Sequence, residues 1–129
     1  MGNEKYEEGM KIRRSVLGEQ YVAQAEAMKS DFDTGFQQFI TEVAWGTVWA
    51  QPELPRKTRH MLAIALLAGL GREHELAAHL RATANTGVTA EEIAEVFHMV
   101  AIYAGVPAAN AAFALAREVG PWFEREDEE

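Results

Sequence analysis

The segment GREHELAAHL, residues 71–80, places an arginine, two glutamates and two histidines within a largely apolar stretch. Successive residues of an α-helix turn by about 100°, so Arg72, Glu75 and His79 are predicted to share one narrow sector, while His74 points the opposite way. Two interpretations follow from the residues alone. Glu75 and His79 could form an ordinary surface pair at i, i+4, worth a few tenths of a kcal/mol, or they could be two ligands of a metal ion.

The metal interpretation is the weaker one. A catalytic zinc ion commonly needs three protein ligands, and the segment offers two, so we expect no metal. His60 is a second candidate for the site, because a helical hairpin could bring it near Arg72. His98, within an apolar stripe, is more typical of a core or interface histidine. Trp45 is more typical of a core residue than of a ligand wall.

The elements that carry these residues are predicted to be helices throughout. Apolar residues recur at helical spacing almost everywhere, and no segment alternates as a strand does. One apolar stripe spans residues 32–43, with Ser30 or Asp31 as the expected N-cap. Pro52 and Pro55 predict a break, followed by a helix from about Arg56 that is apolar around its full circumference. Such a helix is expected to be surrounded by others at the centre of the core.

The second half of the chain shows further helix boundaries. A helix is expected to begin near Glu73 and to end at the NTG of residues 85–87, where Gly87 can adopt the left-handed conformation. Thr89 and Glu92 have the spacing of a capping box. The last helix follows the GVP of residues 105–107 and ends at Gly120. Small residues on the helices before and after Gly71 predict a close antiparallel hairpin.

Size and charge narrow the class of protein. The chain has 129 residues, of which 48% are hydrophobic and 25% charged, so we expect one domain over residues 1–122 and a disordered acidic tail over residues 123–129. A net charge of −8 argues against nucleic-acid binding. The absence of cysteine excludes thiol chemistry. No segment resembles a signal peptide or a membrane span, so a cytoplasmic protein without membrane association is expected.

Two long runs resemble a known family. They are AWGTVWAQPELPRKTRHMLAIALLAGLGREHELAAHLRATANTGVTAEEIAEVF and AIYAGVPAANAAFALA, and they are similar to the carboxymuconolactone decarboxylase family of the alkylhydroperoxidase D-like superfamily. The redox branch of that superfamily has a Cys-x-His-Cys-x-x-x-His signature. Here Arg72 and Glu75 stand at the cysteine positions, while His74 and His79 keep the histidine positions.

The resemblance implies a fold and an activity. It implies an all-α bundle of about six or seven helices around a central antiparallel hairpin, assembled as a homo-oligomer, with a hexamer favoured. The implied reaction is the cofactor-free decarboxylation of 4-carboxymuconolactone, a dicarboxylate lactone, to β-ketoadipate enol-lactone in protocatechuate catabolism. The alternatives are a noncatalytic binding protein of this fold and an enzyme acting on another small acid or lactone.

The resemblance also implies roles for individual residues. Arg72 would anchor a part of the substrate that does not leave. His79 would donate the proton or stabilise the oxyanion. Glu75 would hold the His79 imidazole or relay the proton itself, while His60 and Trp45 would complete the wall of the binding pocket.

Overall fold

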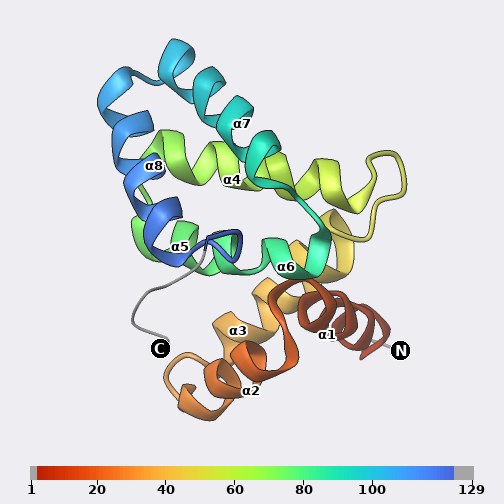
Figure 1. Ribbon diagram of the computed structural model, residues 1–129. Helices are drawn as coiled ribbons and strands as arrows, with labels where there is room; N and C mark the ends of the chain where they lie inside the picture. Colours follow the sequence, from red (N-terminus) through yellow and green to blue (C-terminus); the bar gives the residue numbers. More distant parts are fainter. Residues whose placement is uncertain (1–2, 124–129) are drawn as a thin grey trace. The chain divides into compact units, whose positions relative to one another are not determined.

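The computed structural model describes residues 3–123, which form eight α-helices and one π-helix and contain no β-strand (Figure 1). The predicted all-α class is therefore confirmed. The acidic tail predicted over residues 123–129 lies outside the described residues, except for Phe123. The elements are α1 (Asn3–Leu17), α2 (Glu19–Met28), α3 (Thr34–Ile40), the π-helix η1 (Thr41–Val48), α4 (Arg56–Leu70), α5 (Glu73–Arg81), α6 (Thr83–Thr86), α7 (Ala90–Tyr103) and α8 (Val106–Val119).

The chain divides into two compact units, one up to Arg56 and one from Lys57 onward. One domain over residues 1–122 stays a prediction. Within residues 3–123, the structure contains no helix with the length and apolar character that a bilayer crossing requires.

The first unit is built on the close packing of α1 against η1. A side chain at Gly9 would overlap the backbone of Thr41 and Gly46, and a side chain at Gly46 would overlap the carbonyl oxygen of Lys5. The two helices therefore touch backbone to backbone. Around this crossing, Ile12, Val16 and Trp45 form a small buried core.

The π-helix continues directly from α3 with a wider turn. The amide of Trp49 donates to the carbonyl of Ala44 at 2.8 Å, and the hydroxyl of Thr47 donates to the carbonyl of Glu42 at 3.0 Å, both across five residues. Trp45 and Trp49 stack with ring centroids 4.8 Å apart. π-Helical turns occur frequently at functional sites.

The apolar stripe predicted over residues 32–43 is present but lies on the surface. The exposed fractions are 98% for Phe32, 59% for Phe36, 56% for Phe39 and 42% for Val43. The expected N-cap at Ser30 or Asp31 is wrong by two or three residues, since α3 begins at Thr34 after Asp33. Ser30 and Asp33 instead bond to each other, through the Ser30 amide and the Asp33 carboxylate at 2.7 Å.

The second unit has the larger core, shared by α4, α5, α7 and α8. Phe97 of α7 is fully buried, and its ring meets Phe113 of α8 edge to face at 5.2 Å. Burying one such side chain contributes about 1.5–3 kcal/mol. Fully or almost fully buried members of this core are Ile64, Ala68, Leu76, Leu80, Val88, Ile93, Phe97, Ala109 and Ala112.

The prediction that α4 is surrounded by other helices is wrong for the single chain. Its buried residues are His60, Ile64 and Ala68, which recur every four residues on one face. On the opposite side Leu66 is 64% and Leu70 is 65% exposed. Nothing in the described part of the chain covers that side of the helix, although it is as apolar as the buried one.

Local signals in the second unit are confirmed. Thr89 and Glu92 form the predicted capping box, with the Glu92 amide donating to the Thr89 hydroxyl at 3.1 Å and the Thr89 amide donating to the Glu92 carboxylate at 3.0 Å. Gly87 ends α6 with φ 82°. The predicted hairpin corresponds to α4 and α5, which the tight turn at Gly71 joins, but the predicted close approach of their backbones is not seen, since α5 packs more closely against α8 than against α4.

Candidate functional site

The site begins where the chain leaves α4 and enters α5. Gly71 has φ 73°, a conformation that favours glycine. Arg72 follows as the N-cap of α5, with φ −87° and ψ 76°. Arg72 therefore precedes the first helical residue of α5. Because of this, the helical spacing that was predicted to place Arg72 in one sector with Glu75 and His79 does not apply to it. Both Arg72 and Glu75 are exposed at this end of the helix.

A hydrogen bond between two histidines links α4 to α5. Because the helices are antiparallel, the start of α4 lies beside the end of α5, which brings His60 to His79. Nε2 of His60 lies 3.2 Å from Nδ1 of His79, and the ring centroids are 5.3 Å apart. His60 is completely buried and His79 half-buried. Occupation of Nδ1 by this bond leaves Nε2 of His79 as the ring atom that can meet a ligand.

Thr86 extends this pair into a chain of three side chains. Its Oγ1 lies 2.6 Å from Nδ1 of His60. Both nitrogens of the buried His60 ring are therefore engaged, one by Thr86 and one by His79. Thr86 follows His79 by seven residues, a spacing that puts two residues on the same face of a helix. The sequence did not identify Thr86 as a neighbour of the site, because nothing in the spacing indicates that His60 contacts both residues.

Burial keeps both histidines neutral at physiological pH. It lowers the pKa of His60 to about 4, and the repulsion of a charged His79 adds to the effect. Burial also lowers the pKa of His79 to about 4, against the attraction of the Glu75 carboxylate. Each neutral ring carries one N–H and one bare nitrogen, so the pair can donate one hydrogen bond and accept another.

Glu75 acts on His79 through its charge. Nδ1 of His79 shares a hydrogen bond with His60, whereas Glu75 was the residue expected to hold the imidazole. The negative charge of Glu75 favours protonated His79, although less strongly than burial disfavours it.

The remaining predicted residues have other surroundings. Trp45 belongs to the core of the first unit. His74 is exposed. His98, expected in a core or interface, is exposed in the single chain, and its ring centroid lies 6.2 Å from that of Phe113. Within residues 3–123, no group of three or more histidine, cysteine, aspartate or glutamate side chains has an arrangement suited to a metal ion.

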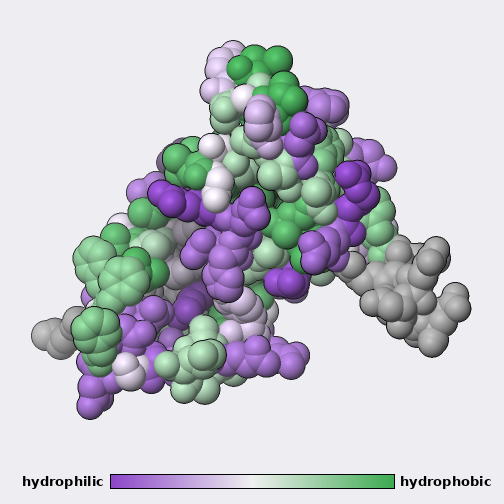
Figure 2. Space-filling model, turned by 90° about the vertical axis from the view of Figure 1, so that its left-hand side faces the viewer, coloured by the Kyte–Doolittle hydropathy of each residue, from purple (hydrophilic) through white to green (hydrophobic). Residues whose placement is uncertain are grey.

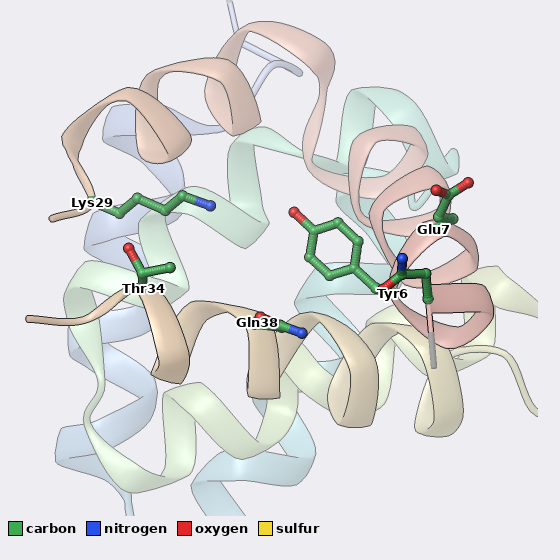
Figure 3. Close-up of a pocket in the computed structure, with 6 residues that line it drawn as sticks. Tyr6, Glu7, Lys29, Thr34 and Gln38 are labelled. Carbon is green, nitrogen blue, oxygen red and sulfur yellow. The ribbon is translucent and has the colours of Figure 1, made fainter. Parts of the chain in front are cut away.

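Each unit also carries a surface pocket. In the first unit, a polar pocket of about 240 Å³ is bordered by Tyr6, Glu7, Lys29, Thr34 and Gln38, and Lys29 and Tyr6 extend toward each other across it (Figure 3). None of the predicted site residues lines this pocket. Lys29 is engaged by Glu26 at 2.7 Å, so its charge is already compensated.

In the second unit, an apolar groove of about 360 Å³ runs between the ends of α4 and α7. Its lining includes Leu66, Leu70, Met99 and Tyr103. Figure 2 shows hydrophobic side chains gathered on the surface where α7 meets α8, next to this groove.

Comparisons with known proteins give a consistent result. The profile of the carboxymuconolactone decarboxylase family matches residues 34–118. The chain is 47% identical over 116 residues to a 4-carboxymuconolactone decarboxylase of Acinetobacter baylyi, covering 90% of this chain and 87% of the relative. It is 43% identical over 102 residues to a nitrosuccinic acid decarboxylase of Metarhizium robertsii, covering 79% of this chain and 71% of the relative.

Proposed function

Because the chain belongs to the carboxymuconolactone decarboxylase family, we propose that it is a carboxy-lyase that converts 4-carboxymuconolactone to β-ketoadipate enol-lactone. The observation that carries the proposal is the 47% identity, over nine tenths of the chain, to a decarboxylase named for that substrate. The reaction would belong to the protocatechuate branch of aromatic catabolism. A cytoplasmic location stays a prediction from the sequence.

The substrate itself can supply the electron sink. When the bond between the ring and the departing carboxylate breaks, its electron pair can move through the ring double bond to the lactone carbonyl oxygen. Carbon dioxide leaves, and a proton then adds to a ring carbon. The protein would bind a dianion, stabilise the negative charge that develops on the lactone oxygen, and deliver the proton.

We assign the charge-stabilising role to His79 and the relay of the proton to the ring carbon to Glu75. Its pKa of about 4 means that the neutral ring acts at physiological pH, by donating a hydrogen bond from Nε2 to the lactone oxygen. A donor already positioned where negative charge develops stabilises the transition state more than the substrate. His60 supports His79 through the bond between their rings.

Arg72 and Glu75 would act at the exposed start of α5. The Arg72 guanidinium can grip the carboxylate of the retained acetate arm with two hydrogen bonds. Binding the departing carboxylate instead would stabilise the ground state and slow its loss. Glu75 can favour proton uptake by His79 through its charge. Trp45 as part of the pocket wall stays a prediction.

We also propose that the protein is a homo-oligomer, with a hexamer favoured. The apolar side of α4 and the stripe of Phe32, Phe36 and Phe39 are exposed in the single chain. Contiguous apolar surface of this kind is typical of protein interfaces. In a homo-oligomer, a second copy of the chain would cover these apolar surfaces.

The assay of the purified protein with 4-carboxymuconolactone tests the function directly. We expect release of CO₂ and formation of the enol-lactone, and a loss of about 100-fold or more in kcat for His79→Ala, as for the removal of a hydrogen-bond donor to a developing oxyanion. His74→Ala, on the exposed opposite side of the same helix, is the matched control. Absence of turnover by the wild-type protein would overturn the assignment.

A second candidate function rests on the other relative. That relative is a nitrosuccinic acid decarboxylase. Nitrosuccinate is also a small dicarboxylate, and its nitro group can stabilise the negative charge that remains on carbon when CO₂ leaves. Nitrosuccinate should therefore be assayed in parallel. A kcat/KM for nitrosuccinate above that for the lactone would favour the second candidate.

A further inference from the structure

The tautomers of His60 and His79 are linked through their shared hydrogen bond. One proton lies between Nε2 of His60 and Nδ1 of His79, and one between Nδ1 of His60 and Oγ1 of Thr86. A neutral histidine has a single ring proton. The two neutral rings therefore have only two arrangements that satisfy both hydrogen bonds.

In the first arrangement, the Thr86 hydroxyl donates to Nδ1 of His60. His60 is then protonated on Nε2 and donates to Nδ1 of His79, so His79 carries its proton on Nε2. In the second arrangement, every donor and acceptor is reversed. His60 then donates to the oxygen of Thr86, and His79 presents a bare Nε2.

The surroundings of Thr86 favour the first arrangement. His60 is the hydrogen-bond partner of Thr86 Oγ1 within residues 3–123. If Thr86 only accepted from His60, its own hydrogen would have no acceptor among those residues. The His60 ring is satisfied in either arrangement, whereas only a donating hydroxyl uses the hydrogen of the half-buried Thr86 in a hydrogen bond within the protein, which contributes about 0.5–1.5 kcal/mol.

From this geometry we infer that Thr86 is a positioning residue whose hydroxyl, by donating to His60, fixes the tautomers of His60 and His79 so that His79 presents a protonated Nε2. The catalytic role of this tautomer rests on the proposed function, in which the Nε2–H of His79 donates to the lactone carbonyl oxygen. The hydroxyl itself touches neither substrate nor reacting atoms. It acts through His60, over two hydrogen bonds.

The tautomers can be observed without substrate. In the protein labelled with ¹⁵N-histidine, ¹H–¹⁵N correlation spectra at neutral pH distinguish protonated from bare ring nitrogens. For the wild-type protein we expect protonated Nε2 and bare Nδ1 on both His60 and His79. A bare Nε2 on His79 would overturn the inference without any variant.

Substitutions test the role of the hydroxyl. Thr86→Val keeps the shape of the side chain but removes the hydroxyl, and we expect His79 to become a mixture of both tautomers, with kcat lowered about tenfold, the worth of one hydrogen bond, and KM little changed. Thr86→Ser should restore both the tautomer and kcat. Thr83→Val is the matched control, because the buried Thr83 hydroxyl donates to the carbonyl of Leu80 at 2.7 Å and not to a histidine.

The two proposals fail differently. If the wild-type protein released no CO₂ from the lactone or from nitrosuccinate, the proposed function would be overturned, while the spectra would still decide the tautomers. Unchanged spectra in Thr86→Val would overturn the inference. So would an altered tautomer with wild-type kcat in an active enzyme, because the tautomer would then have no part in catalysis.

Discussion

His60 near the start of α4 and His79 near the end of α5 share a hydrogen bond of 3.2 Å between Nε2 and Nδ1. The bond exists because the two helices run in opposite directions from the turn at Gly71. It joins two residues 19 positions apart in the chain, and burial keeps both rings neutral.

This pair should make stability depend on pH between 6.5 and 5. The pKa of each ring falls from an ordinary 6.5 to about 4 on folding, so in this range the unfolded chain binds more protons than the folded protein. The contribution of the two neutral rings to the free energy of unfolding is therefore fully present above pH 6.5 and falls as the pH drops toward 4. The slope is at most about 1.4 kcal/mol per pH unit for each ring.

Urea denaturation at several pH values measures this slope. His79→Gln removes one of the two rings with a lowered pKa and should reduce the slope, whereas His98→Gln, at an exposed position, should leave it unchanged. A free energy of unfolding that stays constant from pH 6.5 to 5 would contradict the lowered pKa values.

Arg72→Ala should weaken substrate binding. A hydrogen-bonded contact to a charged group contributes about 1.5–3 kcal/mol, so KM for the dicarboxylate lactone should rise about 10-fold to 100-fold. Arg72→Lys should recover part of the loss, since it keeps the charge but not the bidentate geometry. Steady-state kinetics measure the effect, with Arg81→Ala at the exposed end of α5 as the control. A preference of the wild-type enzyme for a neutral lactone would rule out this anchoring role.

Gly9→Ala and Gly46→Ala should each destabilise the first unit. The added methyl group would overlap backbone atoms of the facing helix, which cannot move as a side chain can, and overpacking of this kind costs about 1–3 kcal/mol or more. Gly35→Ala is the matched control, because nothing lies within 4 Å of its added methyl group and alanine favours a helix by up to about 1 kcal/mol. Thermal or urea unfolding compares the three variants, and equal stabilities would refute the backbone contact between α1 and η1.

Leu66→Glu should reduce the size of the proposed homo-oligomer. Leu66 is 64% exposed and lines the apolar groove between α4 and α7, so a carboxylate there would be desolvated in any interface that covers the groove. Light scattering after size-exclusion chromatography measures the mass, and circular dichroism checks that the helices remain. Glu91→Lys, in the first turn of α7, is the control. A wild-type protein that is monomeric at assay concentrations would argue against the oligomer.

Local features of the fold could be predicted because their causes are local. The capping box of Thr89 and Glu92, the left-handed Gly87 and the helix start near Arg56 each depend on backbone preferences within a few residues. Resemblance along the whole chain likewise identified the family. The placement of the candidate site on α4 and α5 followed from residue types and from that resemblance.

The sequence by itself determined the all-α class, the helix boundaries marked by Pro55, Gly87 and Thr89, and the family, since helical periodicity and capping residues act within one or two turns. Only the tertiary structure decided that His60 bonds to His79 and to Thr86, because that contact depends on the relative register of α4, α5 and α6. It also decided which apolar faces are buried. Phe36 and Leu66 have the spacing of core residues, yet burial depends on a partner surface, and the described chain offers none to either.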